Sequence, residues 1–231
     1  MKKLIIIIGI LSLCLSTTLK AQDSVKIAKP NFHVVEFGFR FMPTFSSFEM
    51  KTYAGGTVKG EVTLGYGIGG LLGLNLSKHV GIQCEVIYNS LSQKYKDQAL
   101  NREFNVRYIN VPLLLSLSTG KSNPVNLNVV IGPQIGYNIG SSITTSGDAT
   151  SDTLQTVLAT KKSDFGFAYG AGLEFALNQP RTIRLDIGYR GVYGFVNISN
   201  TNGAAETGSQ YILDRATIRT NSVYIGFTLL F

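Results

Sequence analysis

Residues 183–190 have the sequence IRLDIGYR, in which apolar and polar residues alternate. Ile183 and Leu185 fall on one side of this segment, and Arg184 and Asp186 fall on the other. Successive side chains of a β-strand point to opposite faces, so this period of two predicts a strand with one apolar and one charged face. Each face of such a strand requires its own environment.

The same alternation recurs in seven other segments. Only 15% of the 231 residues are charged, against about 25% in soluble globular domains. No apolar run after residue 21 reaches the roughly 20 residues that a transmembrane helix needs. The fourth segment is the least regular, because Arg107 falls on its apolar side. Strands are expected at 35–42, 64–75, 80–89, 106–117, 126–139, 164–175, 183–193 and 222–231.

The connections between these segments alternate between short and long. Short turns on the periplasmic side and long loops on the outer side are typical of an up-and-down transmembrane barrel, whereas a Greek-key sandwich gives no reason for the alternation. The sequence therefore predicts an all-β fold, an eight-stranded antiparallel up-and-down transmembrane β-barrel; a soluble periplasmic β-domain is the competing interpretation. Short connections are expected at 77–79, 120–124 and 178–180, and long ones at 46–61, 93–103, 141–162 and 199–215.

The polar sides of the strands predict the content of the barrel. In hydrocarbon the apolar sides face lipid, so the polar sides point inward, and in an eight-stranded barrel side chains fill the interior. Charges of both signs occur there, and buried charges must pair. We expect a closed interior with an ion-pair network, and a narrow channel for small solutes is the alternative. The network is expected to contain Glu36, Arg40, Glu85, Asp164, Glu174, Arg184, Asp186 and Arg190.

Two prolines fall inside the fourth and fifth segments. Pro112 and Pro133 each lack a backbone donor, and prolines within sheets usually mark edges or bulges. Counting back from the turn at 120–124 places them close together on neighbouring strands. The sequence therefore predicts a local bulge in the barrel wall.

The first residues indicate export. A basic start at Lys2 and Lys3, an apolar stretch and a polar end at Ala21 are typical of a secretory signal peptide, which we expect to be cleaved after Ala21. Its removal takes away three lysines and no acidic residue, so the formal charge falls from +7 to +4. The chain is accordingly divided into a signal peptide (1–21), a periplasmic lead-in (22–32) and a barrel (33–231).

The two cysteines add little to the fold. Attachment of a lipid at Cys14 would require a small preceding residue, and Leu13 is not one. Cys14 leaves with the signal peptide, so the exported chain keeps only Cys84 and no intramolecular disulfide is possible. The barrel is expected to depend on burial and hydrogen bonding alone.

Six segments carry a family resemblance through their order and spacing. They are GFRFMPTFS (38–46), YINVPLLL (108–115), VVIGPQIGY (129–137), SDFGFAYGAGLEF (163–175), IRLDIGYRGVYG (183–194) and VYIGFTLLF (223–231). Together with the signal peptide they resemble the PorT-like outer-membrane β-barrel family of Bacteroidetes. The resemblance implies an outer-membrane barrel. The family takes its name from a member linked to protein secretion, and that role does not transfer with the fold.

The carboxyl end and the loops suggest partners. Phe231 resembles the aromatic terminus recognised by the barrel assembly machinery, and it is explained equally well as a lipid-facing residue of the closing strand. Lys161 and Lys162 are placed to meet lipopolysaccharide phosphates at the outer rim. Outer-membrane lipid and an envelope or secretion-system protein are the other expected partners. Nucleic acid is not, because the chain has no basic aromatic platform.

Signals for catalysis or cofactors are weak. Gly65, Gly67 and Gly70 match a dinucleotide motif by letters, but a strand rather than a helix is expected after them. His33 and His79 are the only histidines, and both fall at the predicted periplasmic end. Asp148 and Asp152 lack the spacing of a calcium loop. We therefore expect no enzymatic activity, no metal and no cofactor.

Overall fold

The computed structural model describes residues 32–52, 57–59, 61–97, 100–146, 161–198 and 213–231. Residues Asn31–Phe231 form one compact unit. The predicted signal peptide and residues 22–31 of the lead-in lie outside the described residues. Within the described part of the chain, the structure contains no helix with the length and hydropathy of a membrane span.

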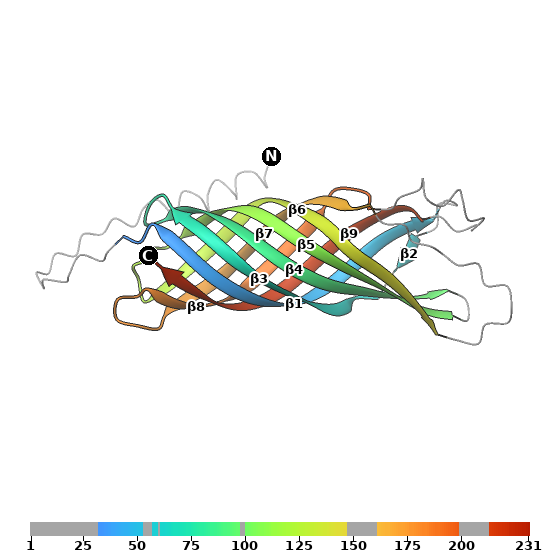
Figure 1. Cartoon of the computed structure of the whole chain (residues 1–231), viewed down its shortest axis with the longest axis horizontal. Helices are drawn as coiled ribbons and strands as arrows, with labels where there is room; N and C mark the ends of the chain where they lie inside the picture. Colours follow the sequence, from blue (N-terminus) through green and yellow to red (C-terminus); the bar gives the residue numbers. More distant parts are fainter. Residues whose placement is uncertain (1–31, 53–56, 60, 98–99, 147–160, 199–212) are drawn as a thin grey trace, which may run out of the picture. The chain divides into compact units, whose positions relative to one another are not determined.

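The described residues form nine strands in a single antiparallel sheet (Figure 1). Each long strand pairs with the next long strand along the chain, and the three-residue β2 pairs with β1. The strands are β1 (Val35–Thr52), β2 (Thr57–Lys59), β3 (Thr63–Asn75), β4 (Val80–Asp97), β5 (Leu100–Ser118), β6 (Val125–Ser146), β7 (Ser163–Ala176), β8 (Ile183–Gly194) and β9 (Leu213–Leu230).

Pairing of β1 with β9 closes the sheet. Phe39 lies opposite Phe227, and the N–H groups of Val35 and Phe231 each donate to the other residue's carbonyl, at 3.2 and 2.8 Å. Apart from β2, the wall consists of eight strands in sequence order. The predicted eight-stranded up-and-down barrel is therefore confirmed. Closure leaves no free strand edge along the paired part of the wall, as a hydrocarbon environment requires.

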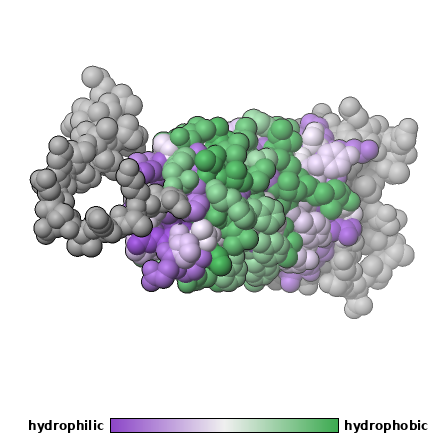
Figure 2. All heavy atoms as spheres, turned by 60° about the vertical axis from the view of Figure 1, so that its left-hand side comes forward, coloured by the Kyte–Doolittle hydropathy of each residue, from purple (hydrophilic) through white to green (hydrophobic). Residues whose placement is uncertain are grey.

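Alternate side chains divide between the outside and the inside of the barrel. On β1, Phe37 and Phe39 are 55% and 51% exposed, whereas Glu36, which precedes them, and Arg40, which follows them, are buried. The same division holds along the other long strands, and on the face drawn in Figure 2 their outward side chains form a continuous apolar belt. We call this belt the apolar band. The two polar ends beyond it are the short-turn end, with the chain termini of the barrel, and the long-loop end.

Several strands continue further than the sequence predicted. The expected loop at 93–103 is instead a hairpin, in which β4 and β5 pair as far as Asp97 and Leu100. The expected loop at 46–61 contains the end of β1 and all of β2, and β6 runs to Ser146. Beyond the apolar band one side of a strand no longer needs to be apolar, so the period-two signal fades while the backbone ladder goes on.

The two prolines interrupt hydrogen bonding but do not shift the register. The flanking pairs Pro112–Gln134 and Leu115–Ile131 keep one register, so no residue is inserted at the prolines. The register shift between β5 and β6 lies instead between Arg107 and Tyr108. A missing N–H removes a ladder bond, whereas a bulge requires an extra residue, and the two need not coincide.

Candidate functional site

The buried charged side chains all point into the barrel and balance in number. Among the described residues there are four acids and four bases, all between 0% and 8% exposed. They come from the four strands β1, β4, β7 and β8 and from the turn between β5 and β6. We call this set the inner network: Glu36, Glu85, Glu174, Asp186, Arg40, Lys121, Arg184 and Arg190.

The first half of the inner network is centred on Glu85 of β4. Arg190 forms a bidentate pair with this carboxylate, with both N–O distances at 3.0 Å, and Arg40 Nη1 lies 2.5 Å from its Oε1. Arg40 also stacks over the ring of Tyr224, 4.7 Å from the centroid, and its Nη2 lies 3.6 Å from Asp186. One carboxylate of β4 thus holds two guanidinium groups, from β1 and from β8, the two strands that flank β9. Because β4 lies four strands away from β8 in the closed wall, the charge-assisted bonds to Arg190 cross the interior.

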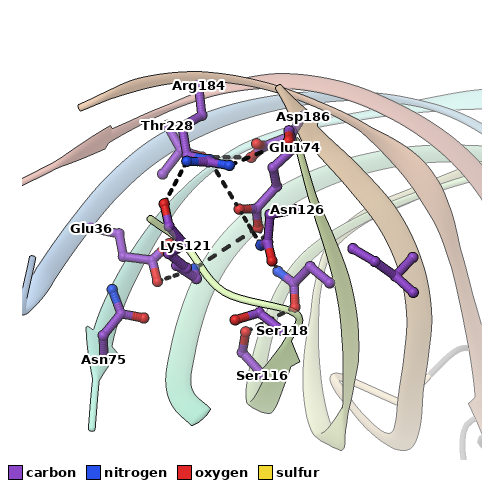
Figure 3. Close-up of polar contacts among 12 residues, drawn as sticks. Glu36, Asn75, Ser116, Ser118, Lys121, Asn126, Glu174, Arg184, Asp186 and Thr228 are labelled. Carbon is purple, nitrogen blue, oxygen red and sulfur yellow. Dashed lines mark hydrogen bonds and ion pairs between the residues drawn. The ribbon is translucent and has the colours of Figure 1, made fainter. Parts of the chain in front are cut away.

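The second half lies at the short-turn end and is centred on Glu174 of β7 (Figure 3). Asn126 and Asn128 of β6 each donate an amide hydrogen to its carboxylate, both at 2.8 Å. Arg184 Nε lies 3.4 Å and Lys121 Nζ 3.9 Å from the same group. Lys121 also bonds to Glu36 of β1. Lys121 therefore joins the carboxylates of β1 and β7 across the barrel mouth.

The turn at 119–124 is anchored into that mouth. Arg184 donates to the carbonyls of Lys121 and Asn123, at 2.6 and 2.9 Å, and Arg181 donates to the carbonyl of Ser122. Gly120 has a φ of 135°, which only glycine adopts without strain, and this backbone allows the next residue to point inward. Figure 3 shows Lys121 among the labelled residues of the strands.

The structure brings together seven of the eight residues that the sequence assigned to the network. The exception is Asp164, which lies toward the long-loop end and has no ion-pair partner among the described residues. The sequence missed Lys121, because turns have no period that indicates where a side chain points. One signal was available: the predicted set held five acids and only three bases, so a base was lacking.

The inward face becomes apolar toward the long-loop end. Phe48 and Phe104 pack edge to face with ring centroids 6.1 Å apart, and the buried Ile198, which follows β8, packs in the same cluster. We call this set the inner apolar cluster: Phe48, Leu91, Phe104, Val106, Tyr108, Ile198 and Ile218. Phe48 lies in a segment that was expected to be a loop, so no inward position was predicted for it.

The remaining predicted positions lie at the surface. Phe231 is 67% exposed and continues the outward face of β9. Lys161 and Lys162 are exposed where the chain enters β7. His33 and His79 lie at the short-turn end, where His79 Nδ1 is 3.1 Å from the Ser118 carbonyl. Asp148 and Asp152 lie outside the described residues. In the described part of the chain, no group of three or more metal-ligating side chains could hold an ion.

Comparison with known families and structures agrees with this architecture. A family model described as "Outer membrane protein beta-barrel domain" matches residues 21–200. No curated protein matches the chain. The solved structure of OprG from Pseudomonas aeruginosa is similar at 14% identity, with a TM-score of 0.51, over 87% of this chain and 98% of that one.

Two further solved barrels are less similar. Neisserial surface protein A has 12% identity and a TM-score of 0.44, over 84% of this chain and 97% of its own. Ail of Yersinia pestis, solved with the heparin analogue sucrose octasulfate, has 14% identity and a TM-score of 0.41, over 85% of this chain and 99% of its own. At such identities the likeness concerns the fold alone.

Proposed function

Because this chain belongs to the outer membrane protein beta-barrel domain family, we propose that it is a non-enzymatic outer-membrane barrel whose interior is closed by the inner network. Its role is then structural, or lies in interactions at the long-loop end. The proposal orients the short-turn end toward the periplasm and the long-loop end toward the outside, as in other barrels of this type.

The observation that carries the proposal is the complete pairing of the buried charges. Each acid of the inner network contacts at least one base, and Glu85 holds two at 2.5 and 3.0 Å. A base with a partner at this distance is not available to a passing solute, and its removal would leave a costly buried charge. The pairing therefore supports a packed core of ion pairs rather than a conducting lumen.

A narrow channel for small solutes is the competing function. It draws support from Gln83, which is 1% exposed and has no hydrogen-bond partner among the described residues for either polar atom of its side chain. Buried polar groups of this kind are normally satisfied by water. A chain of such waters through the barrel would be the beginning of a conducting path.

Planar-bilayer recording separates the two functions. The purified barrel should give no steady single-channel openings, and steady openings would refute the closed interior. Lys121→Ala removes the bridge between Glu36 and Glu174 and leaves Glu36 without its base, so it should loosen the packing of the barrel mouth and raise the frequency of openings. Lys78→Ala is the control, because Lys78 is an exposed lysine in the neighbouring short turn. Heat-modifiable migration in detergent gels shows that each variant has folded.

Export and assembly complete the proposal. The basic and apolar first residues support cleavage of a signal peptide after Ala21, which terminal sequencing of the protein from outer membranes would test. The exposed Phe231 at the end of β9 supports recognition by the barrel assembly machinery. A link to protein secretion is the further proposal that accompanies the PorT-like resemblance, and deletion of the gene followed by measurement of secreted protein would test it.

A further inference from the structure

Three positive charges lie just beyond the apolar band at the long-loop end: Arg107 on β5, and Lys161 and Lys162 directly before β7. On β5 the outward residues are apolar as far as Ile109, and the next outward residue is the exposed Arg107. Ile109 lies opposite Tyr137 of β6, which lies opposite Ser163 of β7. Lys161 and Lys162 immediately precede Ser163 and are exposed. The three cations thus lie near the same edge of the band, with β6 between Arg107 and the two lysines.

A bulge in β6 positions the arginine. Arg107 pairs with Gly140 and Tyr108 pairs with Asn138, so Ile139 is the extra residue. A Cβ atom at Gly140 would lie 2.8 Å from Nη2 of Arg107 and 3.2 Å from its Nε. The guanidinium group therefore lies over Gly140 of β6. Bulges commonly re-aim a side chain in this way.

The opposite edge of β6 brings in the lysines. The Asn138 N–H of β6 donates to the Lys162 carbonyl at 2.8 Å. The backbone of Lys162 therefore lies beside β6, two residues before Gly140, the residue beneath the Arg107 guanidinium. Among the described residues none of the three cations has an acidic partner. Lys94 differs, since it lies 3.9 Å from Glu103 on the neighbouring part of the rim. The charge above β6 is therefore not neutralised by the described wall.

We propose that Arg107, Lys161 and Lys162 bind the phosphate group of an anionic lipid in the outer headgroup layer. The guanidinium fork suits two phosphate oxygens, and the lysines supply point charges beside it. Position selects the source of the phosphate. The acyl chains of a lipid held here would lie along Ile109, Tyr137 and Ile139 directly below. The inference rests on the proposed membrane location and does not depend on whether the interior is closed.

Lipid retention tests the site. The full-length barrel, reconstituted in phosphatidylcholine nanodiscs containing lipid A, is re-extracted in mild detergent, and bound lipid A is counted by native mass spectrometry. The triple variant with Arg107→Gln, Lys161→Gln and Lys162→Gln should retain at least fivefold less lipid A than the unaltered barrel. Lys78→Gln, at the other end of the barrel, should retain as much as the unaltered barrel. Gly140→Val keeps every charge but displaces the Arg107 guanidinium, so the amount of lipid A that it retains should also fall several-fold.

The outcomes distinguish the site from its alternatives. Equal retention by all variants would overturn the proposal, as would full displacement of lipid A by millimolar inorganic phosphate, which would indicate a free-anion site. If the triple variant lost lipid A and Gly140→Val retained it, the positioning of Arg107 by the bulge would be overturned. Heat-modifiable migration and bilayer conductance are recorded for the same samples. A failed membrane barrel would change those readouts, whereas failure of the lipid site alone would leave them unchanged.

Discussion

Single residues of the inner network differ in how many partners depend on them. Glu85 holds both Arg40 and Arg190, and all three side chains are at most 4% exposed. Glu85→Gln keeps the shape of the side chain and leaves two guanidinium groups without their main counter-charge. Breaking a buried pair in this way typically costs about 3–5 kcal/mol. We expect a loss of that order in the free energy of unfolding, measured by urea titration of the barrel in detergent.

A matched exposed pair provides the control for that measurement. Glu103 lies 3.9 Å from Lys94, with side chains 39% and 58% exposed. Exposed pairs contribute about 0–1 kcal/mol, so Glu103→Gln should change the free energy of unfolding little. Equal effects of the two substitutions would contradict the assignment of the inner network as the source of stability.

The residue scale also shows where sequence patterns stop being informative. Seven members of the inner network lie on strands, where alternation assigns each side chain to a face. Lys121 lies in a turn, where its inward direction depends on Gly120 and on the carbonyl contacts of Arg184. Asp164 has the alternation of an inward residue, but alternation gives no height along the barrel axis. A period of two therefore predicts a face and not a partner.

At the scale of the strand, the contact between β5 and β6 is tightest beside the prolines. A Cβ atom at Gly132 would lie 2.0 Å from the backbone oxygen of Leu113, which no side-chain movement can relieve. Gly132→Ala should push the strands apart and lower the free energy of unfolding by about 1–3 kcal/mol, the usual cost of overpacking. Urea titration measures the loss, and faster amide exchange in residues 111–114 would locate it.

Gly70 of β3 is the matching glycine without crowding. A Cβ atom there would meet only the Gly38 oxygen at 3.7 Å, an ordinary contact. Gly70→Ala should therefore be neutral or should stabilise the barrel by about 0.4–1 kcal/mol, because it reduces the freedom of the unfolded chain. If both glycine substitutions destabilised equally, the close approach at Leu113 would not be the cause.

The strands also show how much of the fold was predictable. The number, order and facing of the eight long strands follow from alternation and from connection length. The ends of β4, β5 and β6 do not, because above the apolar band their stability comes from backbone pairing and from the inner apolar cluster. Phe48 and Phe104 meet in that cluster across strands that are far apart in sequence, and a linear pattern has no signal for such a contact.

At the scale of the whole molecule, the barrel inverts the arrangement of a soluble protein. Its large apolar residues lie outside, and Phe227 of β9, for example, is 53% exposed. Among the described residues at the level of the apolar band, most charged side chains lie inside. This arrangement is stable only if hydrocarbon surrounds the apolar band, because large apolar surfaces in water would associate. The inner network is then the polar equivalent of a core.

A charge placed on the band tests this inversion directly. Phe227→Arg should cost about 2–4 kcal/mol of unfolding free energy in lipid bilayers, because arginine near the midplane loses its hydration. Ser142→Arg, on an exposed residue of β6 above the band, should cost about 0–1 kcal/mol in the same vesicles. Urea titration of barrels refolded into phosphatidylcholine vesicles measures both. A barrel whose band faced water would tolerate both substitutions alike, since charge on a wetted surface usually changes stability by no more than about 0.5 kcal/mol.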